Sequence, residues 1–273
     1  MYQSKNSGKN QMSFYSSELA AIARRELLIE QKLKEQDFSE FTMYYMPVVE
    51  AKTSKIVGVE ALIRWFSEDL GFVSPAEFIP IAESRGLFQE LDLWVVEKVM
   101  HDVPALHQLY GQDCKVAINI SSAQLGSENF FLRLMQVVQD IDVSREHLEL
   151  EITETFSAVM SAQVEANLNL FKQAGFSLAL DDFGAGHTSL LQLLDYPLDV
   201  IKIDKSVVER AFTGGAELIN GVISFCKSQG YSITAEGVET KEQADFLIQA
   251  GADTLQGFYF AKPQSLQDLS KNH

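Results

Sequence analysis

Beginning at Phe41, short runs of β-branched and aliphatic residues alternate with longer segments whose apolar residues recur at helical spacing. One such segment carries Leu91, Trp94, Val95 and Val99, whose i, i+3, i+4 and i+8 spacing gathers them on one helical face. Alternation of this kind predicts a parallel sheet built from βα units. The eight predicted strands cover residues 42–49, 55–62, 115–120, 147–152, 177–180, 200–203, 232–235 and 254–256.

Eight is the strand number of an α/β barrel. The chain has 273 residues, a length that fits either two average domains or one barrel of about 250 residues. Gly175, Gly230 and Gly251 fall where apolar helices must end before the next strand begins. The strand count therefore favours an α/β barrel of the TIM type.

The N-terminal segment has a different texture from the rest of the chain. Residues 1–15 are polar, and residues 18–36 are charged with helical spacing. Leu19, Ile22, Leu27, Ile29 and Leu33 could form one loose apolar stripe on that helix. We interpret residues 18–36 as a solvated linker helix that precedes the barrel.

Composition and charge narrow the possible partners. Hydrophobic residues make up 46% of the chain, and no apolar run approaches the roughly 20 residues of a membrane helix. Asp and Glu number 38 against 22 Lys and Arg, a formal charge of −16 that opposes binding to polymeric nucleic acid or an anionic membrane. Cys114 and Cys226 show no metal-binding or secretory pattern, so we expect a cytoplasmic location.

Polar and acidic residues stand at the ends of most predicted strands. A carboxylate that follows an apolar strand costs free energy unless it is paired or binds a cation. Because the C-terminal ends of barrel strands converge on one face, we expect these side chains to meet there. The residues concerned are Glu60, Asn119, Glu151, Asp181, Asp182, Lys202, Glu236 and Gln256.

Oxygen ligands of this kind suit hard divalent cations such as Mg²⁺ or Mn²⁺, and no Cys or His cluster offers a zinc site. The sequence therefore predicts a hydrolytic site with one or two metal ions. The histidines lack ligand spacing and are predicted to be surface or packing residues; they are His101, His107, His147, His187 and His273.

A single acid at a strand end is most often a helix cap or a solvated charge. A shared site is favoured here because Asn119, Lys202 and Gln256 occur at the same strand ends, which capping does not require. Asp204 stays open between the two interpretations, since it could simply cap a helix that begins near Lys205.

Seven motifs occur in order along the chain. They are Glu60–Trp65, Ile118–Ser121, Glu151–Glu154, Asp181–Gly186, Ile201–Asp204, Ala235–Thr240 and Gln256–Pro263. Together they resemble the EAL family of cyclic di-GMP phosphodiesterases, over about residues 41–263. The resemblance implies a modified (β/α)8 barrel with one antiparallel strand, which hydrolyses one phosphodiester of cyclic di-GMP to linear pGpG with Mg²⁺ or Mn²⁺.

The same resemblance implies a role for each matched residue. One cation would be held by Glu60, Asn119, Glu151 and Asp181, and Asp181 would bridge to a second cation held by Asp182 and Glu236. Two cations about 4 Å apart can acidify a shared water and bind a phosphate oxygen. Crowded carboxylates would otherwise repel one another and take up protons.

Other matched residues would act on water, substrate or the neighbouring loop. Lys202 would orient the attacking water or stabilise developing charge, which we favour over a role as general base. Arg64, Glu239 and Gln256 would contact substrate, and the forked Arg64 guanidinium suits a phosphate. Glu154 would support the loop after the fifth strand, residues 181–189, without ligating metal.

Two positions depart from the family pattern. Met46 stands where the family usually has a Gln that contacts ligand, which puts affinity for the dinucleotide in question. His187 stands where Tyr is common in the loop after the fifth strand, so the packing of that loop, and a homodimer contact through it, could differ. Neither change removes a metal ligand.

The N-terminus carries a second, shorter resemblance. Residues 1–5, 8–10 and 14–15 resemble the closing segment of a GGDEF domain. This predicts a longer GGDEF-EAL protein in which residues 1–37 form the end of the GGDEF domain and the interdomain helix. Residues 38–268 would then be the EAL barrel and residues 269–273 a tail, and a membrane anchor could exist upstream.

Two alternatives to the enzyme remain. A catalytically silent EAL module could bind cyclic di-GMP or a partner protein as a receptor, and Met46 favours that interpretation. Silent members are expected to lack metal ligands, whereas this chain keeps every matched ligand and Lys202. A barrel enzyme for another phosphodiester would require the Arg64 and Gln256 matches to be accidental.

Overall fold

A computed structural model describes residues 17–35, 37–139, 143–154, 161–185 and 190–271. Ten strands in these residues form one sheet, and eight of them close into a barrel. The barrel strands are β1 (Phe41–Glu50), β2 (Ile56–Ser67), β4 (Lys115–Ile120), β5 (Leu148–Thr153), β6 (Ser177–Phe183), β7 (Val200–Ile203), β8 (Ser232–Ala235) and β9 (Thr254–Leu255). Two short strands, β3 (Gly71–Val73) and β10 (Gln264–Ser265), pair with the edges of β2 and β1.

The barrel has mixed strand directions, as predicted. Strand β1 runs antiparallel to both of its barrel neighbours, β2 and β9. All other barrel pairs, from β2–β4 round to β8–β9, are parallel. A modified (β/α)8 barrel with one antiparallel strand is therefore confirmed.

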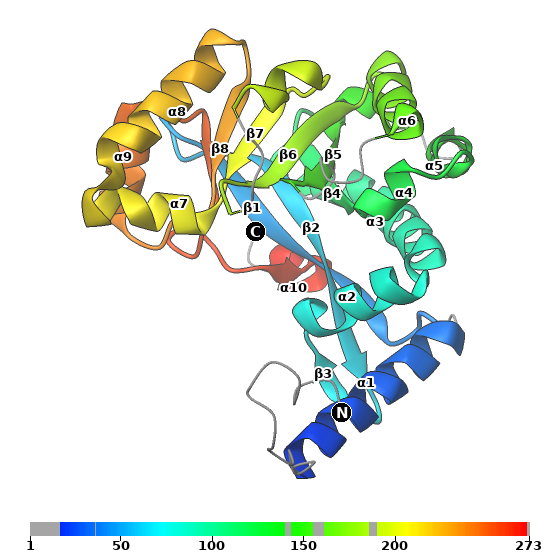
Figure 1. The fold of residues 1–273 in the computed structure, drawn as a ribbon. Helices are drawn as coiled ribbons and strands as arrows, with labels where there is room; N and C mark the ends of the chain where they lie inside the picture. Colours follow the sequence, from blue (N-terminus) through cyan, green and yellow to red (C-terminus); the bar gives the residue numbers. More distant parts are fainter. Residues whose placement is uncertain (1–16, 36, 140–142, 155–160, 186–189, 272–273) are drawn as a thin grey trace, which may run out of the picture.

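Helices follow most of the strands and cover the outside of the barrel (Figure 1). The buried positions of α3, among them Leu91, Val95 and Val99, lie on the face that the sequence pattern predicted. The longer helices are α1 (Ser17–Glu35), α2 (Pro75–Arg85), α3 (Phe88–Tyr110), α5 (Phe130–Gln139), α6 (Ala162–Gln173), α8 (Ala216–Ser228) and α9 (Lys241–Ala250). Shorter ones are α4 (Ser122–Leu125), α7 (Lys205–Arg210), α10 (Leu266–Lys271) and the turns η2 (Arg145–His147), η4 (Gln192–Asp195) and η5 (Ala211–Gly215).

Strand ends differ from the sequence prediction in ways that matter for the site. Strand β2 continues to Ser67, so Glu60 lies within the strand and not late in it. Strand β6 continues to Phe183, so Asp181 and Asp182 belong to the strand and do not follow it. Gln256, predicted inside the last strand, comes directly after β9.

A second, smaller core lies beside the barrel, where β2 projects beyond it with β3 and meets α1 and α2 (Figure 1). Trp65 is 1% exposed, stacks on Phe41 at 4.7 Å and meets the edge of Phe78 at 5.4 Å between ring centroids. Ile29 and Leu33 of α1 are buried in the same cluster. The interpretation of this helix as a solvated linker is therefore wrong for its C-terminal half, because tertiary packing outside the local pattern buries it.

Other apolar side chains of α1, up to Leu27, stay exposed to solvent. Leu19, Ile22 and Leu27 are 46%, 56% and 63% exposed, so the predicted stripe does not act as one packing surface. None of the helices in the described part of the chain is long and apolar enough to cross a membrane.

Candidate active site

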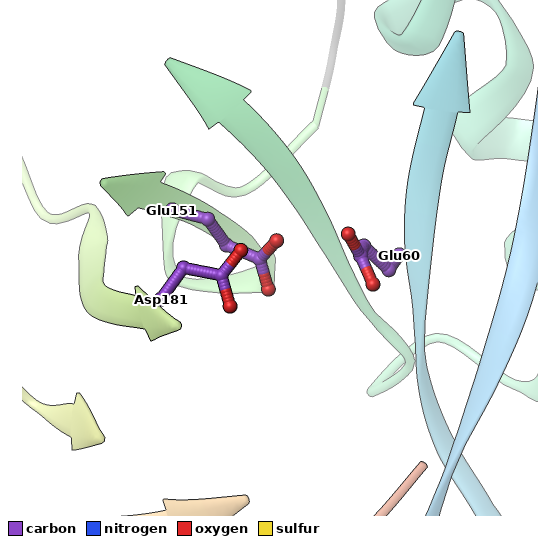
Figure 2. Close-up of side chains that lie close together, drawn as sticks. All are labelled: Glu60, Glu151 and Asp181. Carbon is purple, nitrogen blue, oxygen red and sulfur yellow. The ribbon is translucent and has the colours of Figure 1, made fainter. Parts of the chain in front are cut away.

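Strand register gathers the predicted residues inside the barrel. Alternate residues of a strand face the same side, and the parallel pairs set Asn119 beside Glu151 and Thr153 beside Asp181. The carboxylates of Glu60, Glu151 and Asp181 come from β2, β5 and β6 and face a common space (Figure 2). One carboxylate oxygen from each of the three lies within 4.8 Å of the others.

Lys202 on β7 stands at the centre of these acids and is 2% exposed. Its Nζ lies 2.6 Å from Glu151 Oε1, 2.7 Å from Glu236 Oε1 and 3.0 Å from Asp181 Oδ1. The distance to Glu60 Oε2 is 3.7 Å. One ammonium therefore faces four carboxylates in the barrel interior.

Two amides fix the orientation of Glu60. Asn119 Nδ2 donates to Glu60 Oε1 at 3.0 Å, and Gln256 Nε2 donates to Glu60 Oε2 at 2.5 Å. Both oxygens of a buried carboxylate are thereby satisfied, which a helix cap or a solvated acid would not need. The structure thus brings Asn119 and Gln256 to the acids, as the strand-end pattern predicted.

The excess of negative charge changes the pKa values of the group. Burial raises the pKa of Glu151 well above its usual value and that of Glu236 to about 8. The pKa of Glu60 is lowered overall. Burial acts to raise it, but the Lys202 charge and the hydrogen bonds from Gln256 and Asn119 outweigh that effect. For Lys202, burial lowers the pKa, yet the surrounding carboxylates raise it well above its usual value, so the ammonium form is favoured.

A second group of acids overlaps the first through Asp181. Carboxylate oxygens of Asp181, Asp182 and Glu236 lie within 4.8 Å of one another. Asp182 has a left-handed backbone with φ of 57°, which marks the irregular pairing between β6 and β7. Burial, together with the negative charges of Asp181 and Asp204, raises the pKa of Asp182 to about 6.

The donor set fits divalent cations. Glu151 Oε2 is buried and accepts no hydrogen bond from the described residues, so it is left for another partner. The oxygens that converge come from the carboxylates of Glu60, Glu151, Asp181, Asp182 and Glu236, and Mg²⁺ and Mn²⁺ prefer such ligands. The structure therefore shows an acidic cluster able to hold metal through the residues that the sequence predicted.

Arg64 lies outside this cluster, further along β2. Its Nη1 donates to the Ile63 carbonyl at 2.9 Å, and its guanidinium carbon lies 5.6 Å from the centroid of the Tyr44 ring. Burial lowers its pKa. Arg64 also lines a cavity of about 190 Å³ between β2, α2 and α3 that reaches Asn119.

Sequence reasoning missed Asp92, which lines the same cavity from α3. Its Oδ2 is buried without a hydrogen-bond partner among the described residues, and burial raises its pKa to about 8. A single acid between Leu91 and Leu93 in a helical pattern resembles a solvated position, so only the tertiary structure singles it out.

The remaining predicted residues, Glu154, Glu239 and Asp204, differ in whether they lie near the buried acids. Glu154 is 5% exposed, and its Oε2 accepts a hydrogen bond from Gly184 N at 3.1 Å, at the start of the loop that we predicted it to support. Glu239 lies apart from the buried acids, 48% exposed and 2.5 Å from Lys205 Nζ. Asp204 accepts a hydrogen bond from Ser206 N at 2.9 Å and caps α7, as one of its two open interpretations predicted.

The two departures from the family pattern have different outcomes. Met46 is 9% exposed and lies opposite Glu60 in the β1–β2 register, so the thioether is a neighbour of the acid cluster. His187 and the rest of residues 186–189 lie outside the described residues, as does the GGDEF-like stretch within residues 1–16.

The protein is therefore an α/β barrel whose interior holds a cluster of acidic side chains. The EAL domain family model matches residues 29–263, and the chain belongs to this family. It is 39% identical over 272 residues to the biofilm architecture maintenance protein MbaA of Vibrio cholerae, and 30% identical over 275 residues to the cyclic di-GMP phosphodiesterase NbdA of Pseudomonas aeruginosa.

These alignments cover 99% of this chain but 34% and 35% of MbaA and NbdA. The chain therefore spans about a third of the length of those relatives. Among solved structures, the PaMucR phosphodiesterase in complex with c-di-GMP superposes with a TM-score of 0.82 at 27% identity, over 90% of this chain and 99% of that one. The EAL enzyme Bd1971 with cAMP and cyclic di-GMP gives 0.85 at 28%, over 98% and 71%.

Proposed function

We propose that this EAL domain is a divalent-cation-dependent phosphodiesterase that hydrolyses cyclic di-GMP to linear pGpG. The observation that carries the proposal is the buried cluster in which Glu60, Glu151, Asp181 and Glu236 surround Lys202. Burying four carboxylates around a single lysine ammonium costs folding free energy. A role in binding cations and an anionic substrate accounts for that cost.

The proposed ligand sets follow the two overlapping groups of acids. Glu60, Asn119, Glu151 and Asp181 would hold one cation, and Asp181, Asp182 and Glu236 the other. Bound there, Mg²⁺ or Mn²⁺ would supply Lewis acidity toward a phosphate oxygen and lower the pKa of a water. The cations would also bring the phosphate of cyclic di-GMP to a chain whose formal charge is −16.

Lys202 would orient the water that attacks phosphorus and balance the negative charge that develops on the phosphate. The carboxylates around it raise its pKa, which favours an ammonium that donates hydrogen bonds over a general base. Hydrolysis consumes one water, breaks one P–O bond of the ring, and leaves a phosphate monoester and a hydroxyl.

The cavity beside Arg64 would take part of the substrate away from the reacting phosphate. Arg64 would pair with a phosphate, and the apolar wall with Ile79 and Leu91 suits a flat base. Asp92 would accept hydrogen bonds from the ring N–H and amino groups of a guanine edge. Glu239, exposed and paired with Lys205, would contact substrate only after that ion pair opens.

A receptor that binds cyclic di-GMP without hydrolysing it is the second candidate. One observation favours it: Met46 is buried directly opposite Glu60 and offers a thioether, a weak acceptor, where an amide could hold ligand. The receptor would keep the cation and Arg64 contacts while failing to place the phosphate for attack.

The deciding experiment follows pGpG by chromatography after incubation of the protein with cyclic di-GMP and Mn²⁺, Mg²⁺ or EDTA. We expect product with either cation, none with EDTA, and none from Glu60→Ala. Dinucleotide binding without product would establish the receptor. A Met46→Gln variant that gains turnover would identify the thioether as the reason.

The wider setting completes the proposal. We propose that the chain works in a reducing cytoplasm, consistent with two buried free thiols at Cys114 and Cys226. Residues 1–37, 38–268 and 269–273 would be the end of a GGDEF domain with a connecting helix, the EAL barrel and a tail. A homodimer through the loop after the fifth strand of the barrel series stays a proposal, which analytical ultracentrifugation would test.

A further inference from the structure

Helix α2 lies between the N-terminal helix α1 and the Arg64 cavity. Ile79, Ala82 and Glu83 of α2 line that cavity. Glu77 and Arg85 of the same helix make contacts with α1. One face of α2 therefore contacts α1, and another face forms part of the cavity wall.

The contacts between α1 and α2 are charged and directional. The Arg25 guanidinium pairs with both oxygens of the Glu77 carboxylate, with Nη2 to Oε2 at 3.0 Å, and its Nη1 also donates to the Leu70 carbonyl at 3.3 Å. About two turns further along α2, Arg85 Nε lies 3.0 Å from Glu30 Oε2. Forked Arg–carboxylate pairs restrict orientation more than a single ion pair does.

The local sequence of α2 does little to fix its position. Its 11 residues include Pro80, which removes a backbone donor from the helix interior, and the Ser74 N-cap makes no side-chain hydrogen bond. Short helices depend on tertiary contacts for stability. Phe78 and Ala82 provide buried contacts, Ile79 and Ile81 pack partly buried against the same core, and the ion pairs to α1 add to these.

Ile29 and Leu33 of α1 share a buried core with Phe78 and Ala82 of α2, but beside the ion pairs the contact between the two helices is open. A groove of about 1000 Å³, lined by Ile22 and Leu27 of α1 and by Pro80 and Ile81 of α2, lies between them. On the side of α2 that faces this groove, the charged contacts join the two helices, and apolar packing joins them on the other side.

We propose that Arg25 and Glu30 are positioning residues for substrate binding, acting through Glu77 and Arg85 on the α2 wall of the cavity. The inference rests on the proposed function, because it assigns the cavity to cyclic di-GMP. The further inference is that affinity for the dinucleotide depends on the position of α1 against α2. Glu151, Asp181 and Glu236, which we propose to hold the cations, come from β5, β6 and the residue after β8, whereas α1 packs against Trp65 near the far end of β2. We therefore expect turnover of bound substrate to depend little on α1.

The first test needs no ligand. Hydrogen–deuterium exchange of residues 75–86 is compared among wild type, Arg25→Ala and the control Lys34→Ala, which removes an ion pair made within α1 to Glu30. We expect faster exchange in α2 for Arg25→Ala and not for Lys34→Ala, with β5 to β7 unchanged. Identical exchange in both variants would overturn the proposal, whether or not the protein hydrolyses cyclic di-GMP.

The second test separates positioning from general stability. Arg25→Ala should raise KM for cyclic di-GMP about fivefold, with kcat within about twofold of wild type. The swap of Arg25→Glu with Glu77→Arg should recover most of the lost affinity, and the milder Glu77→Gln should reproduce the loss if Arg25→Ala folds poorly. A fall in kcat at constant KM, or a swap that restores nothing, would contradict the proposal. Wild type that neither binds nor hydrolyses the dinucleotide would instead count against the proposed function, and the exchange experiment would still decide the coupling.

Discussion

Two groups of charged side chains in this protein differ in burial and in balance. In the barrel, Lys202 faces four carboxylates and is 2% exposed. Where α1 contacts the rest of the protein, four basic side chains pair with four acidic ones near solvent. They are Arg25, Lys32, Lys34 and Arg85 against Glu30, Glu40, Asp69 and Glu77. The outer group is neutral as a whole, whereas the inner group would carry three excess negative charges if all four carboxylates were ionised.

The difference explains why one group holds a helix in place and the other suggests chemistry. Water screens the outer pairs, so each contributes little and none requires a further ion. The inner carboxylates lack that screening, and the raised pKa values of Glu151 and Glu236 show the strain on their charged forms. Either protons or divalent cations must neutralise the excess, and the oxygen-rich geometry favours cations.

The largest expected difference between the two groups is the cost of removing one cation from each. Lys202→Met should destabilise the metal-free protein by about 3–5 kcal/mol, because it leaves buried carboxylates without a counter-charge. Arg25→Met should cost about 0.5–1 kcal/mol. Urea denaturation in EDTA measures both. Equal costs would show that the inner acids are protonated and do not depend on Lys202.

Addition of metal is expected to act on the inner group alone. At a free concentration of about 100 Kd, Mn²⁺ or Mg²⁺ should stabilise the wild type by about 2.7 kcal/mol. Asp181→Asn should lose most of that gain, because Asp181 belongs to both ligand groups. Glu77→Gln, a matched change in the outer group, should keep it. Thermal denaturation with and without metal distinguishes the two variants, and an equal gain in both would contradict a site inside the barrel.

Local sequence patterns predicted the inner group well. Strand periodicity and strand-end polar residues identified Glu60, Asn119, Glu151 and Lys202 before their contacts were known, because a parallel barrel turns chain order into spatial convergence. The pattern was less exact about strand ends: β2 and β6 extend past Glu60 and Asp181 because β3 and the irregular β6–β7 pairing continue the sheet.

The outer group could not be predicted in the same way. Residues such as Arg25 and Glu77 are 52 positions apart, and their pairing depends on how α1 packs beside α2. Ile29 and Leu33 likewise differ from Leu19 and Leu27 only in what the fold brings against them. Asp92 escaped notice because burial, and not the helical pattern, makes it unusual.

Asp92 tests what burial does to a carboxylate with no cation beside it. Burial raises its folded-state pKa to about 8, above its usual value of 3.8. The free energy of unfolding should therefore fall as pH rises from about 4 to about 8, and Asp92→Asn should remove that dependence and gain about 1–2 kcal/mol at pH 7. Denaturation at pH 5 and pH 8 measures the effect, with weaker binding of cyclic di-GMP expected in the variant. A stability difference that does not grow with pH would contradict the raised pKa.

Glu40 gives the opposite dependence in the outer group. Burial opposes its ionisation, but hydrogen bonds from Trp65 Nε1 at 2.8 Å and Glu68 N at 2.9 Å outweigh this and lower its pKa to about 2. Its contribution to stability is present above about pH 4.5 and is lost as pH falls toward 2. Glu40→Gln should cost about 1 kcal/mol at pH 7, discounted for solvent screening, and less at pH 3. A cost that is the same at both pH values would show that the shape of the Glu40 side chain, and not its charge, stabilises the pairing of β1 with β2.

The smallest expected effect separates a nearby acid from the inner group itself. Asp204 lies two residues after Lys202, yet its carboxylate caps α7 through Ser206 N. Asp204→Ala should cost about 1 kcal/mol through the lost cap, whereas Asp204→Asn should cost less because the amide oxygen can still accept the bond. Calorimetric titration with Mn²⁺ should give nearly the same Kd for both variants as for wild type. A marked loss of Mn²⁺ affinity in Asp204→Asn would extend the inner group to a fifth carboxylate, because that variant keeps the cap and changes only the charge.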